Sequence, residues 1–450
     1  MSADAPRVSR RAVLATLAGA AVMSAGVRAR ARDRQPVGGR AALRVPWPLG
    51  ALDPHRLDDI ASAIFGAALF DSLYATDGGR LVPALAETMP EASTGGARVK
   101  LRAGVATAEG RPILARDVIA SLARARAGDA KAWLADVPQP RRVDDTTLHF
   151  PGVEPSKLAS ALSSPLCAIV PARFSPERPD ATGPFAASRA SGALVLARNA
   201  RAAQGPAFLD EVSVRAAVDL ADSLRAFEAG SDDVGWLGSG LHEPRAGSRP
   251  FDAGAVGYSL LRTGRDAGSW DMPGVAQRLA NGIAPSQLAH LAPGSPWIVE
   301  PDQGWGGSPC DLIVRDDSPY LIELARAVAA ALARGGQAVT PRPIPTAQLR
   351  QRRASKSYAL AIDVVRPFAP GLLGLLAALA TSDNPELASD AVRHPPRVTD
   401  LSPRVIARTL RIGVLGEIRV QGGRAPDLSL PRAPGGGVSW ADATRGRRTP

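Results

Sequence analysis

The chain has 450 residues, a length that allows two or three domains and a large buried core. Apolar residues make up 45%, as in an ordinary globular protein, and the formal net charge is +11, of which residues 1–31 contribute +4. The arginines are scattered, and the densest basic run, 350–356, is interpreted as a solvated helix end. No basic stripe with interleaved aromatic residues appears, which argues against a nucleic-acid partner.

The first 31 residues have the parts of an export signal. Arg10 and Arg11 precede a short apolar run over residues 12–27, and Ala-Arg-Ala at 29–31 forms a small-x-small cleavage site. The run is shorter than the roughly 20 residues that span a bilayer. The arginine pair resembles a twin-arginine signal, and a Sec signal or membrane anchor is the alternative. We therefore expect an exported, periplasmic protein.

The first half of the chain after this signal alternates predicted strands and helices. Apolar residues at helical spacing predict a helix over 58–73, and Asp117 suits the positive end of a second helix over 117–127. The other predicted elements are strands at 42–46, 99–101, 147–150, 194–199 and 210–216, and helices over 156–162 and 222–229.

The second half repeats the alternation. Its predicted elements are a strand at 257–261, a helix over 272–291, a strand at 311–314, an amphipathic helix over 319–334, and strands at 338–340 and 358–365. A strand–helix–strand series of this kind argues for a second α/β lobe. Residues 404–420 are predicted to return to the first lobe. The tail from Gly422 is rich in Gly, Pro and Arg and is predicted to be loosely ordered.

Two stretches together resemble a known family. The first, 52–126, begins LDPHRLDDIASAIFGAALFDSL and continues through PALAE and LRAGV. The second, 180–236, contains the turn TGPF at 182–185 and ends in DDVGW. In this order the elements resemble the extracellular solute-binding proteins of family 5, the peptide, oligopeptide and nickel receptors of ABC importers.

The resemblance implies an α/β, bilobed, periplasmic-binding-protein-like fold of class II, with an extra subdomain in a large first lobe and two hinge crossings. The expected boundaries are a signal peptide at 1–31, a linker at 32–40, a discontinuous first lobe at 41–256 plus 404–421, a hinge crossing at 257–265, a second lobe at 266–400 and a flexible tail at 422–450.

The resemblance also implies a function. The protein is expected to be a monomer that captures a peptide or similar small solute between its lobes and delivers it to ABC transporter permease subunits. The alternative is a degenerate member of the fold that acts as a sensor or protein-interaction module without transport. A fold alone does not decide between these roles.

Catalytic and metal-binding signatures are missing from the sequence. There is no G-x-S-x-G elbow, no H-E-x-x-H, no phosphate loop, and no pair of histidines at ligand spacing. We therefore expect no enzyme activity, no catalytic residue, no metal site and no cofactor. The two cysteines, Cys167 and Cys310, are expected to be free thiols because the resemblance places them in different lobes.

The candidate ligand-binding residues are Trp47, Trp236, Tyr258, Arg366 and Asp363. The aromatic residues would supply apolar area with a polar handle, and core packing is the equal alternative for Trp236. By pattern, Arg366 stands where peptide-binding relatives have an Asp that holds the peptide's α-ammonium group. A guanidinium there would instead clamp a carboxylate or phosphate, unless it points into solvent. Asp363 is then the alternative partner for a ligand cation.

Overall fold

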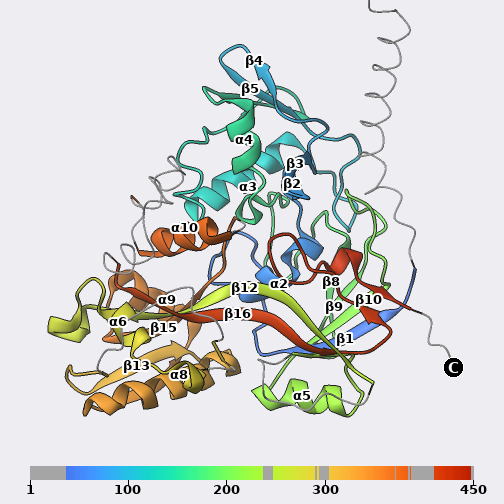
Figure 1. Cartoon of the computed structure of the whole chain (residues 1–450). Helices are drawn as coiled ribbons and strands as arrows, with labels where there is room; N and C mark the ends of the chain where they lie inside the picture. Colours follow the sequence, from blue (N-terminus) through green and yellow to red (C-terminus); the bar gives the residue numbers. More distant parts are fainter. Residues whose placement is uncertain are drawn as a thin grey trace, which may run out of the picture.

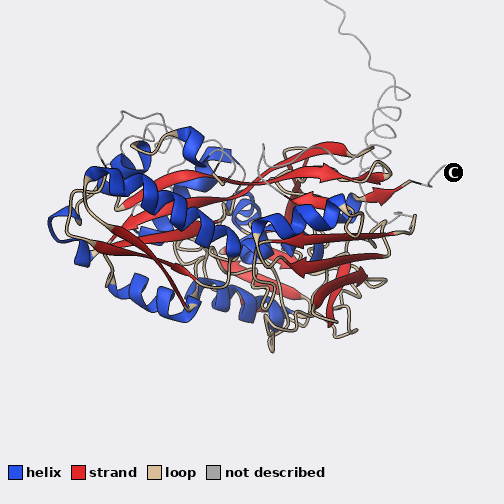
Figure 2. Ribbon diagram, turned by 90° about the horizontal axis from the view of Figure 1, so that it is seen from below, coloured by secondary structure: helices blue, strands red, loops and turns tan. Residues whose placement is uncertain are grey.

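The structure, a computed structural model, describes residues 37–236, 247–288, 291–292, 304–369, 371–383, 386 and 410–446. The predicted signal peptide and most of the predicted linker lie outside these residues. The molecule is α/β, and Figure 2 shows helices and strands in both halves. This arrangement confirms the predicted fold class.

One ten-stranded sheet runs through both halves of the molecule, in the order β14-β13-β15-β12-β16-β11-β1-β10-β9-β8. Its strands are β1 (Arg40–Val45), β8 (Phe185–Ala190), β9 (Ala193–Arg198), β10 (Glu211–Ala216), β11 (Val234–Trp236), β12 (Arg249–Thr263), β13 (Cys310–Arg315), β14 (Val339–Ile344), β15 (Leu360–Val365) and β16 (Ile412–Arg424).

Two long antiparallel strands, β12 and β16, connect the two halves (Figure 1). On one side of this pair the sheet continues into β15, β13 and β14, and on the other side into β11, β1, β10, β9 and β8. The pairing shifts register at three places between Asp252 and Leu260. Such bulges bend a strand and increase its twist, so they let one pair of strands serve two differently oriented lobes.

The first lobe carries an additional small subdomain, drawn at the top of Figure 1. Its four-stranded sheet has the order β4-β5-β7-β6 and its helices are α3 and α4. The subdomain elements are β4 (Glu91–Ser93), β5 (Gly96–Lys100), α3 (Ala115–Ala127), β6 (Arg141–Arg142), β7 (Thr147–Pro151) and α4 (Pro155–Ala161). The remaining elements of the first half of the chain are α2 (Ile60–Leu69), β2 (Tyr74–Asp77), β3 (Arg80–Pro83), the 3₁₀ turn η1 (Pro165–Cys167) and α5 (Leu220–Glu228).

The second lobe is built on the parallel strands β13, β14 and β15. Its other elements are η2 (Arg265–Trp270), α6 (Val275–Asn281), α7 (Pro285–Leu288), α8 (Pro319–Leu332), η3 (Ala333–Gly335), α9 (Thr346–Ser355) and α10 (Gly371–Asp383). Buried residues of α10 share a hydrophobic cluster with the subdomain of the first lobe, and the Phe368 ring lies edge-on to Trp133 at 4.7 Å.

Two predicted elements are wrong. The helix expected over 272–291 is broken into α6 and α7, because Gly282 ends α6 and Pro285 begins a new turn. The tail is also ordered through Gly446: it forms β17 (Leu428–Ser429), η4 (Trp440–Asp442) and β18 (Thr444–Arg445). The Trp440 ring, 2% exposed, stacks on Phe65 of α2 and fixes the tail to the first-lobe core.

Candidate ligand-binding cleft

Parallel strands of both lobes direct their carboxyl ends toward the same region. In the first lobe, β1 runs parallel to β10 and β11, and the chain leaves it at Val45. In the second lobe, β13 runs parallel to β14 and β15, and residues 315–318 and 345–346 follow these strands. Ligands of open α/β sheets bind outside the carboxyl ends of the strands. The topology therefore favours a site between these segments.

A cleft of about 430 Å³ occupies this position. The first lobe contributes the segment 47–61, which joins β1 to α2, together with Pro176 and Glu177. The second lobe contributes Arg315 and Asp317 after β13, and Thr346 and Arg350 of α9. Elements nearly 300 residues apart in the chain thus form one wall of mixed charge.

Asp58 is a buried residue of this wall, 5% exposed. Its carboxylate accepts from Arg56 Nε and Nη2, both at 3.0 Å, and from Arg350 Nε of the other lobe at 2.9 Å. Burial alone would raise the pKa of this carboxyl, but the two guanidinium groups together hold its pKa well below the usual value. Asp58 is therefore ionised under ordinary conditions and bridges the lobes.

The second lobe makes further contacts across the cleft. Arg315 is paired with Asp317 in its own lobe and also donates from Nη1 to the backbone oxygen of Asp58 at 3.3 Å. The buried hydroxyl of Ser318, which caps α8, donates to the backbone oxygen of Pro46 at 2.9 Å. The lobes thus meet through a set of directed polar contacts.

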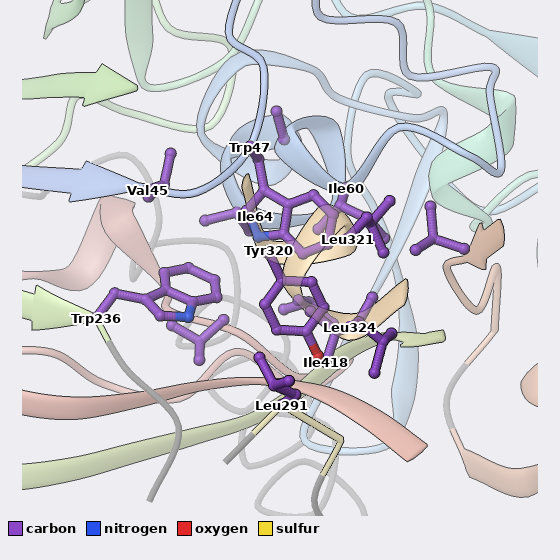
Figure 3. Packing of buried hydrophobic residues seen from close by; sticks show 14 of the residues in the cluster. Val45, Trp47, Ile60, Ile64, Trp236, Leu291, Tyr320, Leu321, Leu324 and Ile418 are labelled. Carbon is purple, nitrogen blue, oxygen red and sulfur yellow. The ribbon is translucent and has the colours of Figure 1, made fainter. Parts of the chain in front are cut away.

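Trp47 is the predicted ligand-binding residue that lines this cleft. Its side chain is 1% exposed and packs on the ring of Tyr320 in α8, with ring centroids 4.9 Å apart (Figure 3). The indole Nε1 is buried without a hydrogen-bond partner. Trp47 is therefore shared between the cleft wall and the core that joins the lobes.

The other two aromatic candidates do not line this cleft. Trp236, at the end of β11, is 4% exposed and belongs to the same core cluster as Trp47 (Figure 3). Tyr258 is half-buried in β12 beside the hydrophobic cluster that α10 shares with the subdomain, where burial raises its pKa. Their roles as ligand contacts stay predictions.

The charged candidates lie in and just after β15 and are not among the residues that line the cleft. Asp363 is buried and accepts from Arg262 Nε at 2.9 Å and from Arg353 Nη1 at 2.7 Å. Arg366 is buried as well: its Nη2 donates to the backbone oxygen of Pro54 and its Nε has no partner. Arg366 thus does not point into solvent, and its role toward a ligand stays a prediction.

A buried histidine supports the first-lobe wall. His55 Nε2 lies 2.8 Å from the backbone oxygen of Ala168, so this nitrogen carries the proton. Its Nδ1 accepts from Arg124 Nη1 at 2.7 Å, while Arg124 also clamps both carboxylate oxygens of Asp53. Burial and the adjacent guanidinium lower the pKa of His55 to about 4. His55 is therefore a neutral, satisfied residue that positions the cleft segment.

Sequence reasoning missed Arg315, Asp317 and Arg350 as wall residues. Asp58 lies inside the quoted LDPHRLDD motif, and Arg350 begins the basic run at 350–356. Neither position carries a sequence signal that pairs it with the other.

In the described parts of the chain, no helix combines the length and apolarity required to cross a bilayer. Within the same residues, no group of three or more His, Cys, Asp or Glu side chains is arranged to hold a metal ion.

Comparison with known proteins identifies a related family. Residues 80–246 match the family described as "Bacterial extracellular solute-binding proteins, family 5 Middle", in agreement with the resemblance seen in the sequence. No curated protein sequence shows significant similarity to this chain.

Solved structures resemble the chain over nearly its whole length. The pheromone receptor PrgZ, solved with its mode of peptide binding, has a TM-score of 0.70 at 15% identity and covers 91% of this chain and 100% of its own. AgaA from A. tumefaciens R10, in complex with agropinic acid, has 0.71 at 16%, covering 91% and 99%. DppA from Helicobacter pylori, in complex with the peptide STSA, has 0.68 at 17%, covering 92% and 99%. At these identities the likeness establishes the bilobed fold.

Proposed function

We propose that this chain, a family 5 solute-binding protein by its matched region and its bilobed fold, is the receptor of an ABC importer. The observation that carries the proposal is the cleft of about 430 Å³ at the carboxyl ends of parallel strands from both lobes. A degenerate module would have less need of such a cleft. No bound solute is chemically changed in this role, so the proposal includes no catalysis.

The size and charge of the cleft favour a small polar solute. Small-molecule pockets span roughly 300–1,000 Å³, and this cleft is near the lower end of that range. Its lining contains charges of both signs, such as Arg350 and Asp317. A short peptide or an amino-acid derivative with both charges suits this wall better than a long peptide does.

We propose Trp47 as the aromatic wall of the site. Isothermal titration calorimetry with di- and tripeptides and amino-acid derivatives tests both the function and this role. Trp47→Phe should weaken binding of a solute that the wild-type protein binds. Trp440→Phe is the matched control, because Trp440 is equally buried but does not line the cleft. Equal loss of affinity in both variants would remove Trp47 from the site, and absence of binding across the panel would count against the receptor.

Export through a twin-arginine signal completes the proposal. Arg10-Arg11 and the cleavage site at 29–31 support it. N-terminal sequencing of protein from the native host should then give a mature chain that begins near Arg32. A cytoplasmic product that retains Met1 would contradict export. Export that survives Arg10-Arg11→Lys-Lys would point to the Sec route.

A further inference from the structure

The segment between β1 and α2 is held by second-lobe side chains at several points. Arg350 and Arg315 contact Asp58, and Ser318 contacts Pro46. At the end of β15, the backbone N–H of Arg366 donates to the backbone oxygen of Leu57 at 2.9 Å. Among these contacts, the pair between Arg350 and Asp58 joins side chains of full opposite charge across the cleft.

The geometry of this pair is that of a strong charged contact. Arg350 presents Nε at 2.9 Å to Asp58 Oδ2 and Nη2 at 3.3 Å to Oδ1, so the guanidinium uses two nitrogens. The carboxylate is buried, whereas the Arg350 side chain is 42% exposed. The burial of Asp58 limits screening by salt and makes the contact stronger than an ordinary surface pair.

If the lobes separate, the buried charges of Asp58 and Arg315 each keep a partner of opposite charge in their own lobe. Asp58 keeps both hydrogen bonds from Arg56, which lies in the same segment. Arg315 keeps its pair with Asp317. Arg350 is already partly in water and can be solvated fully. Breaking a buried ion pair is costly because one charge is left unpaired, and this arrangement avoids that cost.

We propose that the Arg350–Asp58 pair is a reversible latch that sets the balance between closed and open lobes, independently of which solute occupies the cleft. The latch favours closure through a charged hydrogen bond, yet it can be released because the buried Asp58 has a second partner, Arg56, in its own lobe. In the ligand-free protein, loss of Arg350 should shift the closed-to-open ratio toward the open form on the order of tenfold, the size expected for a charge-assisted hydrogen bond.

Small-angle X-ray scattering on the ligand-free full chain tests the latch. Arg350→Gln should increase the radius of gyration, and Arg350→Lys should restore part of the closed form. The matched control is Arg342→Gln, which removes an equally short pair, with Asp311 at 2.7 Å, inside the second lobe. Circular dichroism verifies that each variant is folded.

A second variant keeps the test decisive. Asp58→Asn should open the lobes as Arg350→Gln does, and the double variant should open them no further than the larger single effect, because both changes remove one contact. Wild-type scattering from Arg350→Gln, or equal expansion in Arg342→Gln, would overturn the latch. Either result would leave the proposal of solute binding standing, because the scattering experiment contains no solute.

Discussion

Acidification should destabilise this protein through His55 before its paired carboxylates are protonated. The imidazole is buried, and its Nδ1 already accepts from the cationic Arg124. Burial disfavours the charged imidazolium, and a second proton on Nδ1 would be directed at that guanidinium, so the folded-state pKa falls to about 4 from 6.5. The unfolded chain therefore binds more protons than the folded chain between these two values. Stability is full above the unfolded pKa and is lost as pH falls toward the folded pKa.

The size of this loss follows from the two pKa values. A shift from 6.5 to about 4 corresponds to about 3 kcal/mol of unfolding free energy at about 1.4 kcal/mol per pKa unit. Asp53 and Asp58 contribute little in this window, because their usual pKa of 3.8 and their lowered folded-state pKa values both lie below it. Asp59 has a raised pKa, so its contribution has the opposite sign and offsets part of the loss. The comparison with a variant isolates the histidine.

Urea unfolding at a series of pH values measures the effect. His55→Gln retains an amide that can donate to Ala168 and accept from Arg124 but cannot be protonated, so its stability should change less between about pH 7 and pH 4.5. His149→Gln is the control, since His149 is the other histidine in the described residues and lies in β7 beside Ser93. If wild type and His55→Gln lose the same free energy over this range, the reasoning is refuted.

Two further substitutions test the core by chemical unfolding. Asp363→Asn should cost about 3–5 kcal/mol because it leaves two guanidinium groups without their shared anion, whereas Asp311→Asn at an exposed pair should cost less than about 1 kcal/mol; similar costs would contradict the buried network. Gly183→Ala would place Cβ 2.5 Å from the carbonyl carbon of Leu69 and should cost about 1–3 kcal/mol, whereas Gly50→Ala meets nothing within 4 Å; a neutral Gly183→Ala would show that this approach is not tight.

Local signals in the sequence were sufficient for much of the first lobe. The periodic run after Asp58 became α2, where the Asp59 side chain accepts from the Ser62 N–H and fixes the helix start two residues later than expected. The turn at 182–185 also lies against the end of α2, as its glycine requires. These features depend on neighbours within a few residues, which a sequence pattern can report.

Other features were hidden because they depend on distant partners. The tail was expected to be loose from its composition, but Trp440 is buried against Phe65, 375 positions earlier in the chain. The helix α10 contains mostly apolar residues around its whole circumference, so no amphipathic stripe marked it. Both are tertiary effects that override local composition.

The charged contact across the cleft was also beyond sequence-based prediction. Asp58 and Arg350 meet only because β13, β14 and β15 direct their carboxyl ends toward the segment after β1. The sequence pattern pointed instead to the end of β15, where Asp363 and Arg366 are buried against other protein groups. The family pattern could not supply the pairing of charges across two lobes, because that pairing depends on residues far apart in the chain.

Native mass spectrometry of protein purified from its own host tests the central claim most directly, that a small solute is bound between the lobes. The account predicts a non-covalent adduct of small-molecule mass that is lost on unfolding, is retained in Trp440→Phe and is reduced in Trp47→Phe. A chain that carries no adduct and that acquires none from periplasmic extract would contradict the claim.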